Sequence, residues 1–143
     1  ELSHAVYISA QVRAQEDEEY VALVREVEDV YTVIMGDLTS AIQADACHSN
    51  YSPVFELFDE TEAFDVECEI GHPADNGDEM FASILTTTLY APETIAPRFN
   101  QLDERQKTQA VRAYRAVIAV TDAAAQNGTP LVPMDSPVRT LIA

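Results

Sequence analysis

Four side chains that could bind a metal ion fall within 26 positions of one another. Two thiolates and two imidazoles form the closed tetrahedral shell that zinc prefers, so the residue types are suitable. The four residues are Cys47, His48, Cys68 and His72. Their spacing is poor, because the closely spaced cysteine pair of a zinc knuckle is absent and two adjacent residues would both have to ligate. We therefore predict two reduced structural cysteines and no metal site, with these four as weak candidates.

The residues for acid–base or covalent catalysis are few. The imidazoles are those of His4, His48 and His72, and none lies in a known catalytic frame such as G-x-S-x-G or H-E-x-x-H. The four glycines are scattered, so no glycine-rich loop could surround a phosphate. The sequence therefore predicts a protein that is not an enzyme and that needs no cofactor.

The charge of the chain is uneven. The 143 residues carry 25 acidic and 8 basic side chains, a net charge of −17. Residues 16–79 hold 19 of the acids and one base, Arg25, while residues 80–143 are slightly basic. This balance excludes direct nucleic-acid binding, since the chain cannot neutralise a run of phosphates. No apolar run approaches the roughly 18 residues that span a membrane.

Two explanations of this acidity stay open. Adaptation to high salt would enrich acids, but over the whole surface rather than in one half. An acidic face that meets a basic protein, or another copy of this chain, would concentrate them. Asp65, Glu67 and Glu69 alternate with apolar residues in the acidic half, so we predict that they line one face of a strand and contact a partner.

Residues Arg105, Arg112 and Arg115 form a basic stripe on a predicted helix, at spacings of seven and three. One interpretation pairs this basic stripe with acids of the first helix in the same chain. The other pairs it with the acidic face of a neighbouring copy, a contact that closes into rings or continues as filaments.

The first of the secondary-structure elements that position these residues lies at the N-terminus, where apolar and polar residues alternate. Two alternating sets share residues 4–13: Val6, Ile8, Ala10 and Val12 on one side, and Tyr7, Ser9, Gln11 and Arg13 on the other. This period of two predicts a half-buried strand, with a helical turn as the alternative. Residues 16–46 have apolar positions three and four apart and an acidic start, which predicts a long helix. Gly36 lies inside that pattern and marks a kink or a break.

The second half contains a predicted hairpin and a second helix. Residues 54–58 and 64–70 form two apolar segments around an acidic turn, as in a β-hairpin with one wet face. Residues 80–90 are ambiguous, because three consecutive threonines favour a strand while the flanking loop and proline also frame a helix. Residues 101–126 show clear helical periodicity.

The last fifteen residues carry three prolines among apolar residues such as Leu131 and Val132. Prolines disfavour a helix, so we predict an extended edge strand or arm over 129–143 that lies on a surface, including that of a neighbouring copy. Together these elements predict one α+β domain over 1–128: a two-layer sandwich of a small antiparallel sheet with two helices on one face. The alternative is a mostly α fold with one hairpin.

The function predicted from these features is a non-enzymatic structural or adaptor subunit that acts through protein–protein contacts, most simply in a homo-oligomer. A viral or phage particle is one setting for such subunits. Two other classes stay open: an acidic inhibitor that mimics nucleic acid and occupies a basic cleft, and a small metal-binding domain or enzyme that uses the four Cys and His residues.

Overall fold

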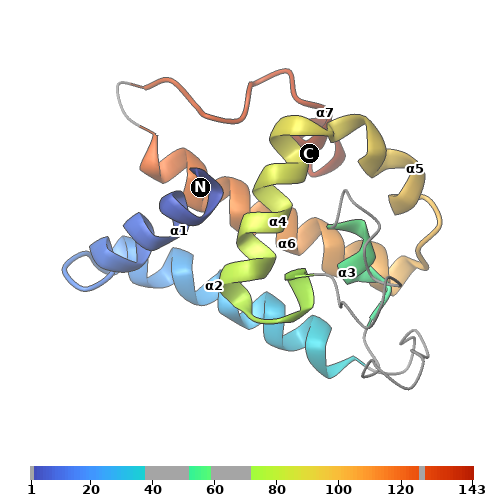
Figure 1. Ribbon diagram of the computed structural model, residues 1–143, viewed down its shortest axis with the longest axis horizontal. Coiled ribbons are helices and arrows are strands. Elements are labelled where there is room, and N and C mark those ends of the chain that lie inside the picture. The colour runs from blue at the N-terminus through green and yellow to red at the C-terminus, as the bar shows by residue number, and fades with distance from the viewer. Residues whose placement is uncertain (1, 38–51, 59–71, 126–127) are drawn as a thin grey trace.

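The computed structural model describes residues 2–37, 52–58, 72–125 and 128–143. These residues form helices joined by turns, and none of them lies in a strand (Figure 1). The elements are α1 (Leu2–Arg13), α2 (Glu18–Gly36), α3 (Val54–Leu57), η3 (His72–Ala74), α4 (Gly77–Tyr90), η4 (Pro92–Thr94), α5 (Ile95–Phe99), α6 (Glu104–Ala124) and α7 (Pro137–Leu141). The predicted α+β sandwich is therefore wrong, and the mostly α alternative fits in part.

The segment predicted as an N-terminal strand is the helix α1. Its buried residues Ser3, Tyr7 and Ala10 are three and four apart, the spacing of one helix face. The alternation misled the prediction, because Ile8 and Val12 of the alternating apolar set are exposed. Tyr7, which the strand would place on the opposite side from them, is among the most completely buried side chains of the described chain.

The segment predicted as the first hairpin strand, residues 54–58, contains the short helix α3, and Phe55 and Phe58 are fully buried. Its predicted partner strand, residues 64–70, lies outside the described residues. The ambiguous segment 80–90 belongs to α4. Asn76 caps that helix, since its side chain accepts a hydrogen bond from the backbone N–H of Glu79, and such a cap favours a helix over a strand.

The two long predicted helices are present. Asp17 caps the start of α2, and the helix ends at Gly36, the position that predicted a break. The continuation predicted to residue 46 lies outside the described residues. Helix α6 begins after a capping box in which Asp103 and Gln106 satisfy each other's backbone N–H groups. Its predicted apolar face is buried, apart from the half-buried Val111.

The C-terminal segment is not an extended edge strand. It contains the short helix α7, which Pro137 begins after the capping residue Ser136, because proline is favoured at the first helical position. Val132 and Val138 are buried. The segment therefore covers its own chain (Figure 1).

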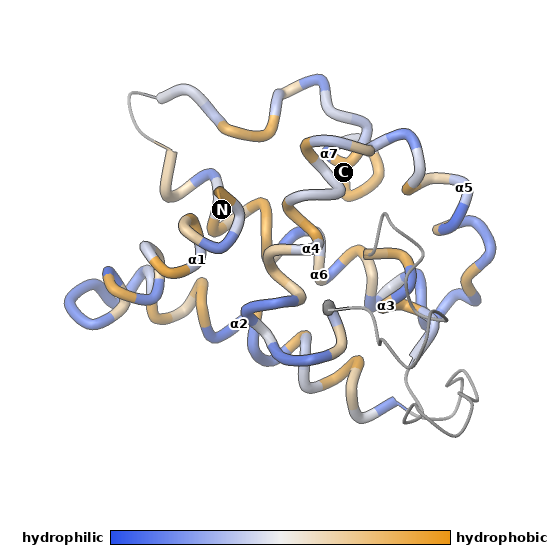
Figure 2. The backbone as a smooth tube through the Cα atoms, viewed as in Figure 1, coloured by the Kyte–Doolittle hydropathy of each residue, from blue (hydrophilic) through white to orange (hydrophobic). Residues whose placement is uncertain are grey.

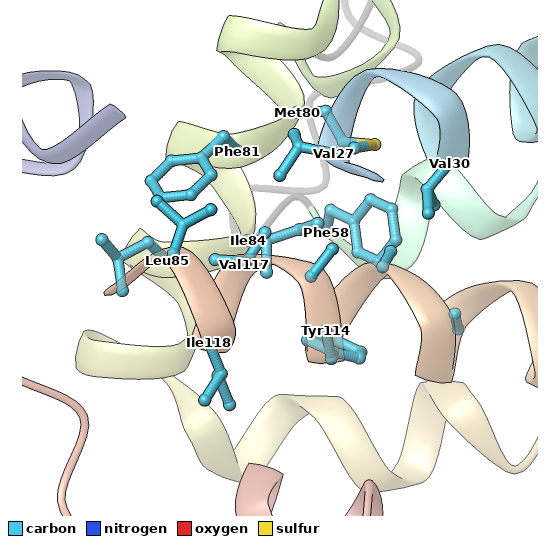
Figure 3. Close-up of a cluster of buried hydrophobic side chains, with 14 of the residues drawn as sticks. Val27, Val30, Phe58, Met80, Phe81, Ile84, Leu85, Tyr114, Val117 and Ile118 are labelled. Carbon is cyan, nitrogen blue, oxygen red and sulfur yellow. The ribbon is translucent and has the colours of Figure 1, made fainter. Parts of the chain in front are cut away.

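The core lies where α2, α4 and α6 meet. Figure 3 shows side chains of these three helices together with Phe58 from the end of α3. Tyr7 stacks on Phe81 with ring centroids 4.5 Å apart, and Phe58 meets Tyr114 edge to face at 5.5 Å. In Figure 2 the turn between α1 and α2 is hydrophilic.

Candidate interaction surface

The outward face of α1 carries apolar side chains. Leu2, Ala5, Ile8 and Val12 are exposed and are spaced by three, three and four residues, so they share one side of the helix. We call these four residues the α1 stripe. Ile8 is 54% and Val12 57% exposed. An apolar side chain exposed alone is ordinary, whereas a row along one helix is typical of a contact surface.

The inward face of α1 explains why the apolar residues point outward. The Tyr7 hydroxyl donates a hydrogen bond to the carboxylate of Glu28 on α2, and the Ser3 hydroxyl lies 2.8 Å from that of Thr86 on α4. Burial, followed by the bond to Glu28, raises the pKa of Tyr7 above its usual range. These contacts fix the rotation of α1 about its axis.

Glu28 also depends on a glycine. A Cβ added at Gly77, the first residue of α4, would lie 2.2 Å from Oε2 of Glu28. The close approach of that carboxylate to α4 therefore requires glycine at this position. Glu28, Tyr7 and Gly77 thus join α2, α1 and α4 at one point.

Acidic side chains border the α1 stripe. Gln11 donates from Nε2 to Oδ1 of Asp78 at 3.2 Å, and Nε2 of His4 lies 3.3 Å from Oε1 of Glu79. Beyond the C-terminal end of α1, residues 16–19 (Glu, Asp, Glu, Glu) are all exposed. We call Asp78, Glu79 and residues 16–19 the acidic border.

The basic stripe lies on α6, and its arginines contact their own chain. Arg112 binds both carboxylate oxygens of Glu26 on α2, at 2.7 and 2.8 Å. Arg105 places Nε 2.8 Å from the carboxylate of Asp37, which follows α2 directly. Arg115 donates twice to the carbonyl of Ile142. Arg105 and Arg112 thus pair within the chain, as the intramolecular interpretation of the basic stripe expects.

The Arg112–Glu26 pair has an electrostatic consequence. The hydrogen bonds from Arg112 hold the pKa of Glu26 below its ordinary value, against the smaller opposing effect of burial. The pair is about two fifths exposed, so it contributes little to stability. It links α2 to α6 and leaves the Arg112 charge neutralised.

The predicted contact residues of the C-terminal segment differ in exposure. Val132 is fully buried within its own chain, while Leu131 is partly exposed. Leu131 lines a cavity of about 320 Å³ together with Val6 of α1. Arg139 holds the segment in place through two bonds to the carboxylate of Asp122, at 2.7 and 3.0 Å.

Several predicted sites lie outside the described residues. They are Asp65, Glu67, Glu69, Cys47, His48 and Cys68, while His72 begins η3. The expectation that these residues form no metal site, and the predicted acidic strand face, therefore stay predictions. Within the described ranges, no three His, Cys, Asp or Glu residues gather to hold a metal ion. No helix in that part of the chain combines the length and the hydrophobicity needed to cross a membrane.

The sequence interpretation missed the α1 stripe. The spacing of Leu2, Ala5, Ile8 and Val12 is helical. Comparing how many apolar residues fit a helical period with how many fit a period of two would have indicated an apolar helix face. That comparison still would not show which face of the helix is buried against the rest of the chain. Comparison with protein-family models, with curated proteins and with solved structures gives no match.

Proposed function

We propose that this protein is a non-enzymatic interaction module that binds a basic protein partner through the α1 stripe and its acidic border. The observation that carries the proposal is the exposed apolar row on α1, which includes Ile8 and Val12. Two other residues of the same helix, Gln11 and His4, contact the carboxylates of Asp78 and Glu79. An apolar centre with a charged rim is the usual composition of a protein–protein contact.

The two parts of this surface have different roles in binding. Burial of the exposed part of Ile8 or Val12 in a partner contributes about 1 kcal/mol each. The acidic border attracts a basic surface over several ångströms, accelerates association and makes it depend on salt. A partner that presents apolar residues flanked by Lys or Arg satisfies both parts.

A second copy of this chain fits the surface less well. Two copies meeting through the α1 stripe would bring two acidic borders together, and like charges repel. The basic stripe offers little compensation, because Arg105 and Arg112 are paired with Asp37 and Glu26 of their own chain. A basic partner therefore accounts for the surface better than self-assembly.

The test uses a synthetic helical peptide of Leu and Lys in which the leucines form one face. Its control has the same composition in an order that breaks that face. Calorimetry should show that the patterned peptide binds more tightly than the control, by about tenfold, because only its leucines can contact the α1 stripe together. Amide shifts in a titration should concentrate on residues 2–19 and 78–79.

Matched variants locate the contact. The double variant Ile8→Ser, Val12→Ser should lose most of the preference for the patterned peptide. Met134→Ser removes an even more exposed apolar side chain from the C-terminal segment and should bind as the wild type does. Equal affinity for the two peptides, or equal losses in the two variants, would contradict the proposal.

Self-assembly and mimicry are tested separately. Light scattering should find a monomer at both low and high salt. If the wild type is an oligomer and the Ile8→Ser, Val12→Ser variant is a monomer, the α1 stripe binds a second copy instead. An acidic mimic of nucleic acid would bind the two peptides equally, since it recognises charge without an apolar face.

A further inference from the structure

A second surface lies on α6, away from the α1 stripe. It is a groove of about 780 Å³ formed by α6 with Phe99 of α5 and Glu26 of α2. Its volume falls in the usual range of small-molecule sites. The site and any occupant are independent of the proposed function, because no residue of the α1 stripe or its border lines the groove.

The charge of this groove differs from that of the chain. Lys107, Arg112 and Arg115 line it, three of the eight basic residues in a chain of net charge −17. Glu26 and Glu104 also line it. Glu26 neutralises Arg112 through two hydrogen bonds, whereas Glu104 is 93% exposed and lies 3.4 Å from Lys107. The lining therefore has one more positive charge than negative.

Arg115 carries the uncompensated charge. Its Nε and Nη2 donate to the carbonyl of Ile142 at 3.0 and 2.8 Å, which fixes the plane of the guanidinium. No carboxylate among the described residues pairs with it, and its Nη1 has no hydrogen-bond partner there. A guanidinium held in place with free N–H groups is a donor for a carboxylate or a sulfonate.

The remaining lining is apolar. Phe99 and Val111 are half-buried, and Ala116 is nearly buried, so they form a floor beside the cations. Nζ of Lys107 lies 5.9 Å from the centre of the Phe99 ring, so its charge is held over the same floor. Such a surface accepts an apolar body whose single negative group reaches Arg115.

We infer that this groove binds a small amphiphilic organic anion, with its carboxylate or sulfonate on Arg115 and its apolar part on Phe99, Val111 and Ala116. Charge complementarity supports this occupant over a neutral apolar molecule, because only the anion can accept a charge-assisted hydrogen bond from the N–H groups of Arg115. A polyanion is disfavoured, since the groove has a single uncompensated charge and the rest of the chain repels negative charge.

The test uses two probes of the same shape that differ in one group. They are 8-anilinonaphthalene-1-sulfonate and N-phenyl-1-naphthylamine, which lacks the sulfonate. In fluorescence titrations the anionic probe should bind about tenfold more tightly, which is the effect of one charge-assisted hydrogen bond. Decanoate should displace it, because it presents the same charge on an apolar chain. The amide shifts should fall on α5 and α6.

Variants separate the groove from other surfaces. Arg115→Gln should remove most of the preference for the anionic probe, and Arg25→Gln, which removes an exposed arginine of α2 outside the groove, should leave it unchanged. Val111→Glu keeps Arg115 and its bonds to Ile142 but places a negative charge on the floor. This variant should also weaken the binding of the anionic probe, whereas Val33→Glu on the exposed side of α2 should leave that binding unchanged.

Some results would overturn the inference. Equal affinity for both probes would show a merely apolar surface. A loss of binding in the Ile8→Ser, Val12→Ser variant would show that the probe binds the α1 stripe and not the groove. An equal loss in Arg115→Gln and Arg25→Gln would show an effect of net charge alone. The melting temperature of each variant checks that folding is retained, and the two independent substitutions in the groove keep the test decisive if one of them unfolds the protein.

Discussion

Helices α1 and α6 use their apolar residues in opposite ways. Helix α6 buries Ala113, Val117 and Val120 against the core and exposes mainly polar side chains. Helix α1 buries Ser3 and Tyr7 and exposes Ile8 and Val12. The position of α6 thus follows from its hydrophobic periodicity, while that of α1 follows from hydrogen bonds and ring stacking. An apolar face left outside by such contacts is available to a partner.

The strongest test of this comparison makes the same substitution in both helices. Ile118→Ala on α6 should lower the free energy of unfolding by about 2 to 4 kcal/mol, because it leaves a cavity in a packed core. Ile8→Ala on α1 should change it by less than about 0.5 kcal/mol, since the side chain is already half exposed. Urea denaturation measures both. A similar cost at the two positions would show that the α1 stripe is covered in the free protein.

A second test exchanges the buried tyrosines for phenylalanine. Tyr7→Phe should cost about 1 to 2 kcal/mol of unfolding free energy, because Glu28 loses a hydrogen bond that it cannot fully replace. The buried hydroxyl of Tyr114 on α6 has no hydrogen-bond partner among the described residues, and burial raises the pKa of this tyrosine beyond its usual range. Tyr114→Phe should therefore be neutral or stabilising by up to about 1 kcal/mol.

One result would contradict the expectation for Tyr114→Phe. If this variant loses as much unfolding free energy as Tyr7→Phe does, the Tyr114 hydroxyl has a hydrogen-bond partner after all. The edge-to-face contact with Phe58 is retained in the variant, so a change in ring packing would not explain such a loss. Thermal unfolding of both variants in the same buffer makes the comparison.

The smallest expected effect concerns the pair that joins α6 to α2. The pKa of Glu26 is lower in the folded protein than its ordinary value of 4.5, so the pair stabilises the fold at neutral pH. That contribution disappears as the pH falls below about 4.5 and through the folded-state pKa. Because the pair is about two fifths exposed, Glu26→Gln should cost only about 0.5 kcal/mol at neutral pH.

The pH dependence supplies the control for that variant. The difference in unfolding free energy between the wild type and Glu26→Gln should vanish in acid, where both side chains are neutral. Thr108→Ser on the exposed side of α6 should show no pH-dependent difference. A difference that stays constant from neutral to acid pH would contradict the role of the Arg112–Glu26 pair.

Part of the candidate surface was predictable from the sequence. The acidity of residues 16–19 and 78–79 is visible directly, and the basic residues of α6 follow from its periodicity. The internal partners of those arginines were not fixed by the sequence, since Arg112 had several acids of the first helix within reach. The α1 stripe was missed because two of its residues, Ile8 and Val12, also belong to an alternating set of apolar residues that predicted a strand.

The sequence alone determined that α2 and α6 are helices, because helical periodicity depends on contacts between near neighbours. Asp17 and Asp103 are capping residues, Gly36 ends a helix, and the apolar spacing of α6 matches a buried face. The uneven distribution of charge is likewise a property of the chain itself.

The tertiary structure alone decided which side of α1 is buried and what the C-terminal segment covers. Both features depend on contacts between residues distant in sequence. Tyr7 donates a hydrogen bond to Glu28 and stacks on Phe81, and Arg139 donates a hydrogen bond to Asp122. Prolines in the C-terminal segment excluded a long helix, yet Pro137 began a short one because its neighbours could cap it. Local periodicity specifies an element, whereas its orientation depends on the partners that satisfy its polar groups.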